Sequence, residues 1–279
     1  MNIVNILEEI EKVDGEIYER LNPRRAAMKD FFNLGKKVAL SAAPLALGSM
    51  FTKAYGQTAP SGVIDVLNFA LTLEYLEYHF YNHSLLAAPG LIPAGAATTA
   101  ITTIRDHEKA HVDLLKGAIT ANGGTPVSFT YDQFDFTAKN TFPTVYTNYD
   151  TFLAVAQAFE DTGVRAYKGQ ATALKGMAVL TTALQIHSVE ARHAAHIRSM
   201  RAARGATIKP WISLGPGDVA NGTGIAAVND VYAGENVDAQ AGITITGIAT
   251  GVTKAAAVES FDEPLTKPAV LAIASLFIK

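Results

Sequence analysis

The sequence predicts an all-α protein whose core is a four-helix bundle with one long crossover. Apolar side chains recur at helical spacing in four long stretches, at about 63–87, 93–122, 150–167 and 177–204. A long stretch without such periodicity separates the second of these from the third. Two equivalent sets of polar residues also repeat along the four stretches, which indicates that the helices face a common interior.

Glycine and proline residues mark the ends of the predicted helices. Proline cannot continue a helix, and glycine readily adopts the backbone conformation that follows a helix terminus. These residues are Pro89 and Gly90 after the first stretch, Gly123 and Gly124 after the second, and Gly205 after the fourth. We therefore expect each of these helices to end close to the glycine or proline residues that follow it.

The connections between the helices predict the topology. A short, polar and glycine-containing link at 169–176 makes the third and fourth helices antiparallel neighbours. The stretch 123–149 contains two prolines and several aromatic residues but no helical pattern. A loop of this length in a compact domain needs a reason, and a crossover that travels along the bundle supplies one.

We divide the chain into an N-terminal segment (1–56), the bundle (57–205) and a C-terminal extension (206–279). The extension is rich in Gly, Val and Thr, and its alternating residues 242–247 predict a short strand. Residues 268–279 resemble a terminal apolar helix. We interpret the extension as an irregular appendage to the bundle and not as an independent enzyme domain.

The N-terminal segment combines a predicted amphipathic helix with the features of an export signal. Apolar residues recur at helical spacing over 3–21, with glutamates on the other face. Arg24 and Arg25 then precede an apolar run at 38–51 and small residues at 54–56, which is the order of a signal peptide. The paired arginines resemble a twin-arginine signal.

These features predict export to the periplasm. The apolar run is too short for an ordinary transmembrane helix, so we expect no membrane span in the mature chain. The stretch before the paired arginines is unusually long and acidic for such a signal. The alternative is therefore a cytoplasmic protein in which residues 1–56 are retained as helices packed on the bundle.

Composition excludes several classes of site. The net charge is −3 without a block of like charges, so we expect no nucleic-acid partner. The chain contains no cysteine, which excludes disulfides, thiolate zinc sites and iron–sulfur clusters. Any metal must therefore be bound by oxygen and imidazole ligands.

Two of the predicted helices contain a Glu-x-x-His motif. The second helix contains Glu108 and His111, and the fourth contains Glu190 and His193. Side chains three residues apart lie on one face of a helix, so each pair can chelate a metal without any loop geometry. A single copy of such a motif is weak evidence, whereas two copies on helices of one bundle are much stronger.

The first and third helices each add a glutamate that is followed seven residues later by a tyrosine. These pairs are Glu74 with Tyr81 and Glu160 with Tyr167. The chain thus reads Glu-x6-Tyr, Glu-x-x-His, Glu-x6-Tyr, Glu-x-x-His, which is the ligand order of helix-bundle proteins with two-metal carboxylate sites. Four glutamates would balance two divalent cations, and oxygen and imidazole ligands suit iron or manganese.

The chain resembles the ferritin-like domain proteins, a bacterial and plant group that includes desiccation-related proteins. The segment 67–81 resembles the first helix of that group, and 232–237 and 261–266 resemble the C-terminal region of its bacterial members. The resemblance covers about residues 60–279 and implies a ferritin-like bundle. It also implies that the six residues Glu74, Glu108, His111, Glu160, Glu190 and His193 are bridging and terminal metal ligands, with Tyr81 and Tyr167 beside the metals.

The resemblance does not choose among ferroxidase, catalase, peroxidase and oxygenase activities, because one fold hosts them all. We expect an oxidoreductase that acts on dioxygen, peroxide or ferrous iron, in a homo-oligomer. The alternative is a non-catalytic iron-binding or stress-protection protein of the same fold.

Two ligand assignments keep a competitor. Glu77 could replace Glu74, since both can face the interior, although the spacing to the tyrosine favours Glu74. Otherwise Glu77 is expected to be solvated or paired in a salt bridge. His187 could replace His193, although the internal repeat favours His193.

The remaining histidines near the motifs and the single tryptophan are also assigned positions. His107 and His196 flank the two motifs and should lie near the ligands or on the surface. His79 and His83 are expected to be exposed. Trp211, the only tryptophan, is expected to anchor the C-terminal extension to the bundle.

Overall fold

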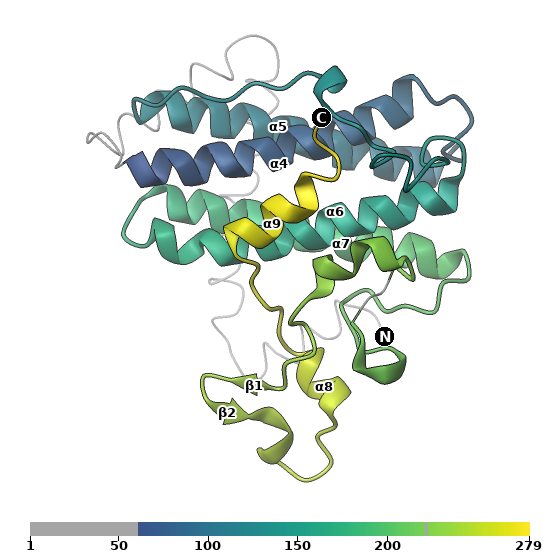
Figure 1. Cartoon of the computed structure of the whole chain (residues 1–279), viewed down its shortest axis with the longest axis vertical. Helices are drawn as coiled ribbons and strands as arrows, with labels where there is room; N and C mark the ends of the chain where they lie inside the picture. Colours follow the sequence, from purple (N-terminus) through teal and green to yellow (C-terminus); the bar gives the residue numbers. More distant parts are fainter. Residues whose placement is uncertain (1–60, 221–222) are drawn as a thin grey trace, which may run out of the picture. The chain divides into compact units, whose positions relative to one another are not determined.

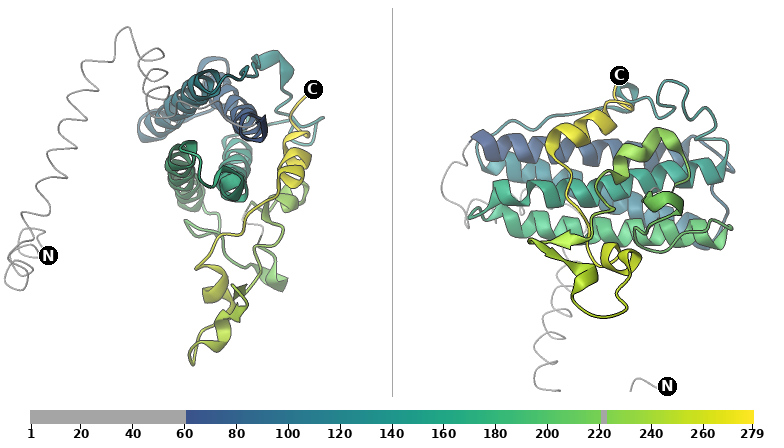
Figure 2. Two further views of the ribbon diagram at one scale, coloured as in Figure 1. Left: turned by 90° about the vertical axis from the view of Figure 1, so that its left-hand side faces the viewer. Right: turned by 60° about the horizontal axis from the view of Figure 1, so that its bottom comes forward.

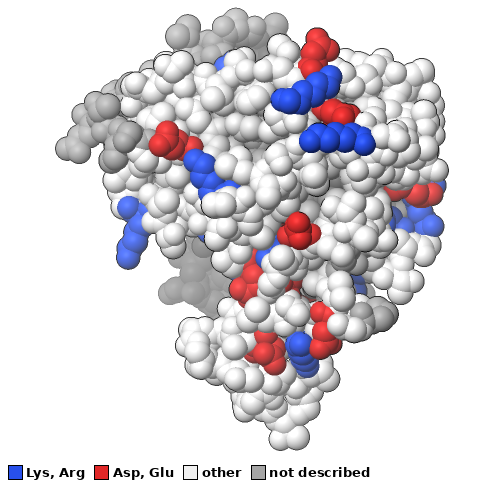
Figure 3. All heavy atoms as spheres, viewed as in Figure 1, with Lys and Arg blue, Asp and Glu red and all other residues white. Residues whose placement is uncertain are grey.

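The computed structural model describes residues 61–220 and 223–279. The predicted amphipathic helix and export signal, at 1–56, lie outside the described residues, so export stays a prediction. Among the described helices, none combines the length and the apolar character that crossing a membrane requires. On the face shown in Figure 3, described charged side chains of both signs are scattered, without a large patch of one sign.

The core is a bundle of four long helices, as predicted (Figure 1). The helices are α4 (Ser61–Leu86), α5 (Ala96–Ala121), α6 (Tyr149–Gln170) and α7 (Val179–Ala203). α4 packs mainly against α5, and α6 mainly against α7, so the bundle consists of two helical hairpins. Figure 2 shows this arrangement along the bundle axis. The all-α prediction is confirmed.

The remaining elements are short. They are the 3₁₀ turns Tyr131–Gln133, Ala171–Leu174, Pro216–Asp218, Ala226–Tyr232 and Ile245–Gly247, the strands β1 (Ala239–Gln240) and β2 (Ile243–Thr244), and the helices α8 (Lys254–Val258) and α9 (Lys267–Ala274). β1 and β2 form a two-stranded antiparallel ladder, which contains part of the predicted strand. The terminal helix α9 is shorter than predicted, because residues 275–279 leave it as a turn and an isolated bridge.

The crossover between α5 and α6 is held against α4 by aromatic side chains. Phe80 on α4 is fully buried and contacts Phe136 of the crossover, with 5.4 Å between ring centroids. His79 donates from Nε2 to the carbonyl oxygen of Phe129 in the crossover, at 3.0 Å. The ring of His83 stacks on Tyr131 at 4.3 Å.

The expectation that His79 and His83 are exposed is therefore wrong. Both are only partly exposed, because the crossover covers them. Sequence spacing placed these two side chains on the outer face of α4, but it could not show that a loop distant in sequence packs over that face.

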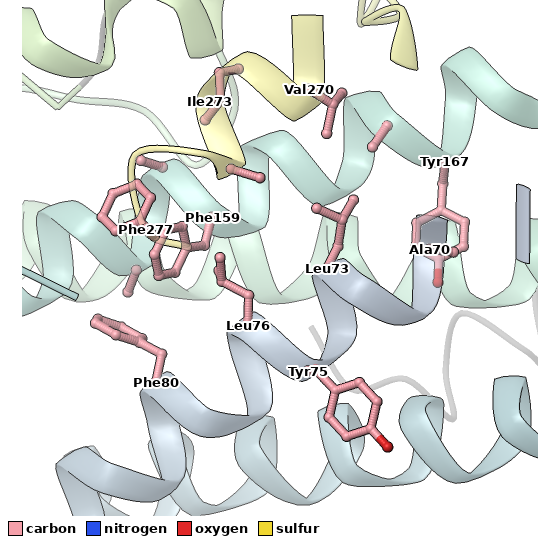
Figure 4. Close-up of a cluster of buried hydrophobic side chains, with 14 of the residues drawn as sticks. Ala70, Leu73, Tyr75, Leu76, Phe80, Phe159, Tyr167, Val270, Ile273 and Phe277 are labelled. Atoms are coloured by element: carbon pink, nitrogen blue, oxygen red, sulfur yellow. The ribbon is translucent and has the colours of Figure 1, made fainter. Parts of the chain in front are cut away.

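The C-terminal extension returns to the bundle through α9. Figure 4 shows Val270 and Ile273 of α9 facing the bundle, and Phe277 beside Phe159 of α6. The rings of Phe277 and Phe159 lie 4.7 Å apart in an edge-to-face arrangement. An isolated bridge pairs Ile278 with Phe134 of the crossover. The end of the described chain is thus part of the core.

Two buried arginines fasten the extension to the bundle. Arg165 on α6 donates to the carbonyl oxygens of Val231, Ala233 and Glu263 and forms an ion pair with Glu235, at 2.8 Å. Gly169, also on α6, lies directly against the extension. A Cβ at this position would overlap the carbonyl oxygen of Leu265. The extension therefore lies directly on the backbone of α6.

The second arginine, Arg198 on α7, pairs with Asp161 at 2.6 Å, and the hydroxyl of Tyr232 donates to the same carboxylate at 2.7 Å. Trp211 contributes only its backbone carbonyl to Arg198, and its side chain is half exposed. The expectation that the Trp211 ring anchors the extension is wrong: buried polar groups do so, and apolar periodicity gives no sign of them.

Candidate metal centre

The six predicted ligands converge in the middle of the bundle. One comes from α4, one from α6, and two each from α5 and α7. All four glutamates are 0% exposed, and the two histidines are nearly as buried. They form two overlapping groups of possible ligand atoms, Glu74, Glu108, His111 and Glu190 in one and Glu108, Glu160, Glu190 and His193 in the other.

The first group surrounds Nδ1 of His111. This atom lies 3.0 Å from Oε2 of Glu74, 3.1 Å from Oε2 of Glu108 and 3.2 Å from Oε1 of Glu190. A single ring N–H cannot serve three carboxylate oxygens at once. Two donor atoms that bind one ion at about 2.1 Å, with an angle of about 90° between them, lie about 3 Å apart. The spacing therefore fits a shared cation.

The second group surrounds Nδ1 of His193. It lies 2.8 Å from Oε1 of Glu108 and 3.3 Å from Oε2 of Glu160. Glu108 thus directs one oxygen to each histidine, and Glu190 belongs to both groups. The two halves are related as the sequence repeat predicts, with shared carboxylates from α5 and α7 and one further glutamate for each half.

Each tyrosine of the repeat hydrogen-bonds to a glutamate on the other hairpin. Tyr81 on α4 donates to Oε1 of Glu160 on α6, at 2.5 Å. Tyr167 on α6 donates in turn to Oε1 of Glu74 on α4. Each tyrosine therefore holds one oxygen of a glutamate and leaves the other oxygen facing a histidine. The sequence placed both tyrosines near the site, but it could not show this crossed pairing.

Electrostatics favour a cation in the cluster. Burial raises the pKa of Glu74 to about 7. Burial, together with the charges of Glu108 and Glu74, also raises the pKa of Glu190 well above its usual value. Burial has the opposite effect on His193, where it lowers the pKa, but Glu160 and Glu108 outweigh it and raise the pKa to about 11. Without a cation, the carboxylates and imidazoles must retain protons to limit the uncompensated charge.

Unpaired buried atoms give a second test of fit. Oε1 of Glu108, Oε2 of Glu160, both oxygens of Glu190 and Nδ1 of His193 have no hydrogen-bond partner of good geometry. Buried polar atoms without partners are rare and costly. All five belong to the ligand set, and metal ions at the two groups would satisfy them. The residues present therefore fit two metal ions.

A further carboxylate lies beside the cluster. Glu77 is buried, and its pKa is raised well above the usual range by burial and then by Glu190 and the other glutamates. It does not belong to either ligand group, whereas Glu74 does. The expectation that Glu77 is solvated or salt-bridged does not fit this position. The sequence held one signal for this position: Glu77 and Tyr81 are four residues apart, so they lie on the same face of α4.

Gly163 on α6 makes room for Glu77 and Glu190. A Cβ at this position would lie 3.1 Å from Oε2 of Glu190 and 3.3 Å from Oε1 of Glu77. Sequence reasoning missed this glycine, since a helical glycine gives no sign of what approaches it. The close approach indicates that α6 is shaped to accommodate the two carboxylates.

We expect the Gly163→Ala variant to lose metal without losing stability. The new methyl group should displace the carboxylates and lower metal affinity at least about 10-fold, while alanine favours the helix by up to about 1 kcal/mol. Metal titration and thermal unfolding of the metal-free protein measure the two effects. Gly117→Ala on α5 is the matched control, because nothing lies within 4 Å of its added Cβ. Equal affinity in both variants would contradict this account of Gly163.

The Tyr167→Phe variant should bind metal about 10–100-fold more weakly at the Glu74 half of the site, since it removes the group that orients a ligand oxygen. The other half should be less affected. Competition with a chelator of known affinity measures the change. Tyr146→Phe serves as control, because its hydroxyl contacts the carbonyl oxygen of Phe80, at 3.4 Å, and the side chain of Tyr131, neither of which is a predicted ligand. Equal affinities in the two variants would show that Tyr167 does not orient Glu74.

The remaining histidines differ in their relation to the cluster. His187 donates from Nδ1 to the carbonyl oxygen of Val164, at 3.0 Å, which directs it away from the ligands. His196 is exposed. His107 lies against the outer side of His193, with 2.9 Å between its Nδ1 and Nε2 of His193. One of the two flanking histidines therefore contacts a predicted ligand.

The fold and the site together define a class of protein: a four-helix bundle with a long crossover and a buried carboxylate–histidine cluster compatible with metal binding. A sequence model of the ferritin-like domain matches residues 62–203, just over half of the chain. The chain belongs to the ferritin-like domain family. The predicted membership of the ferritin-like superfamily is thus confirmed. No curated protein gives a significant sequence match.

Proposed function

We propose that the bundle holds two iron or manganese ions and acts as an oxidoreductase on dioxygen, peroxide or ferrous iron. The observation that carries the proposal is the sharing of Glu108 and Glu190 between two ligand groups, each completed by one histidine and one further glutamate. This arrangement fits two adjacent ions better than one. Two adjacent redox-active ions would supply the electrons that such substrates exchange.

The chain's own residues would have three tasks. The four glutamates balance the charge of two divalent ions in an interior that otherwise disfavours charge. Tyr81 and Tyr167 hold one oxygen of Glu160 and Glu74, so that each carboxylate keeps its orientation. The surrounding apolar side chains limit the access of water.

Elemental analysis of protein purified without chelators tests the proposal. We expect about two iron or manganese ions per chain, and their loss in a Glu108→Ala, Glu190→Ala double variant. The loaded protein is then assayed with peroxide and with ferrous iron. A folded wild type that remains metal-free after anaerobic loading with iron and manganese would overturn the proposal and favour a non-catalytic protective role.

The oligomeric state separates two forms of the proposal. A homo-oligomer stays a prediction, and light scattering on the purified chain measures it. A closed shell of many subunits would favour iron storage, whereas a monomer or dimer would favour a redox enzyme.

A further inference from the structure

A large cleft lies between α5 and α7, on the outer side of the metal centre. Its volume is about 800 Å³, within the range of about 300–1,000 Å³ that is typical of sites for small molecules. It runs along the N-terminal half of α5 and the C-terminal half of α7. Small or flexible side chains form most of its walls, among them Ala97, Ala100, Thr103, Met200 and Ala203.

The inner end of the cleft is polar and adjoins the metal centre. His193 and His107 both line it, with their rings stacked at 5.2 Å. Because Nδ1 of His193 faces Glu108 and Glu160, its other nitrogen, Nε2, must carry the proton when Nδ1 binds a metal. That proton is then donated to Nδ1 of His107, at 2.9 Å. Nε2 of His107 is consequently left as a hydrogen-bond donor.

The charges at this end complement an anion. Arg192 lines the cleft beside His107 and has no ion-pair or hydrogen-bond partner among the described residues. Arg204, near the other end, already pairs with Asp150. Of the described side chains that line the cleft, none is acidic. A negatively charged group would therefore be favoured next to Arg192 and His107.

The apolar wall sets the length of the tail that an anionic ligand could carry. Ala97 and His107 are ten positions apart on α5, which corresponds to about 15 Å along the helix. An extended covalent chain advances about 1.2 Å per bond, so a chain of roughly ten carbons spans about 11 Å and fits within this length. The cleft therefore fits a molecule with a charged head at its inner end and an aliphatic tail between the helices.

We propose that this cleft binds a medium-chain aliphatic carboxylate. The carboxylate accepts hydrogen bonds from Arg192 and from Nε2 of His107, and the tail lies between α5 and α7 along Ala97, Ala100 and Met200. Binding of the carboxylate to Arg192 does not require a metal, whereas a metal on His193 is what leaves Nε2 of His107 as a donor. The link from the carboxylate through His107 and His193 to the metal centre rests on the proposed function.

Decanoate is the probe, titrated into the full chain by calorimetry. We expect saturable binding to the wild type and weaker binding of decanol, which has no charge. Arg192→Gln should weaken decanoate binding about 10–100-fold, the loss typical of a hydrogen bond to a charged group. Ala100→Phe should abolish binding because the ring fills the space of the tail. Ala202→Phe, at an exposed position of α7 outside the cleft, is the matched control.

Several outcomes would overturn the proposal. The first is that the wild type shows no saturable binding of decanoate. The second is that the Ala100→Phe and Ala202→Phe variants bind decanoate equally well. The third is that the wild type binds decanol as tightly as decanoate. If Ala100→Phe does not fold, Ala97→Phe fills the same wall and replaces it.

Metal content is measured in the same samples, and it separates the two proposals. Decanoate binding that Ala100→Phe abolishes, in a wild type that contains no metal, would leave the cleft proposal standing and refute the metal centre. Metal in both proteins without decanoate binding would refute the cleft alone.

Discussion

A Glu108→Gln variant should lose both metal ions, whereas Glu74→Gln should keep about one. Glu108 directs its two oxygens to different histidines, at 3.1 Å from His111 and 2.8 Å from His193. Of these two histidines, Glu74 contacts only His111. We expect metal content below about a tenth of the wild-type value for Glu108→Gln. Even the loss of a group that only orients a ligand costs about 10–100-fold in affinity.

Elemental analysis after equal metal loading measures the difference. Asp113→Asn is the control on the same helix, because Asp113 is partly exposed and, within the described part of the chain, forms its ion pair with Lys109 and not with a predicted ligand. Circular dichroism establishes that each variant is folded. If Glu74→Gln and Glu108→Gln retained the same amount of metal, the assignment of Glu108 as the shared ligand would be wrong.

The Arg165→Ala variant should be destabilised by about 3–5 kcal/mol, because breaking a buried ion pair leaves an uncompensated charge. The side chain of Arg165 is 1% exposed and that of its partner Glu235 is 0% exposed. Removing Arg165 would also leave three backbone carbonyl oxygens of the extension without their donor. We therefore expect the extension to become sensitive to proteases before the bundle unfolds.

Urea denaturation measures the change in free energy of unfolding. Arg204→Ala is the matched control, because its ion pair with Asp150 is exposed and should contribute less than about 1 kcal/mol. An Arg165→Met, Glu235→Gln double variant should recover part of the loss, since it removes both charges of the buried pair and leaves neither of them uncompensated. Similar destabilisation of the two single variants would show that the buried pair does not fasten the extension.

Much of the candidate site could be predicted because the spacing within a helix is local geometry. Any helix puts Glu108 and His111 on one face, whatever surrounds it, and the same holds for Glu190 and His193. Repetition of the motif then indicated a site with two equivalent halves. The structure places all six predicted side chains together, as this argument requires.

Contacts between helices were beyond such reasoning. Glu74 and Glu77 are three residues apart on one face of α4, so their spacing alone cannot decide which of them faces His111. The structure decides for Glu74, through contacts that depend on how α4 and α5 pack. The crossed hydrogen bonds of the tyrosines depend in the same way on the packing of α4 against α6.

The sequence by itself determined the four helices, the crossover, the faces that carry the carboxylates and the absence of thiolate chemistry. Each of these results from periodicity, helix-ending residues or composition, which are properties of short segments. Only the tertiary structure decided the rest: which glutamates are shared, the place of Glu77 beside Gly163, and the fastening of the extension by Arg165. These depend on groups far apart in the chain, and their contact geometry arises only when the helices pack.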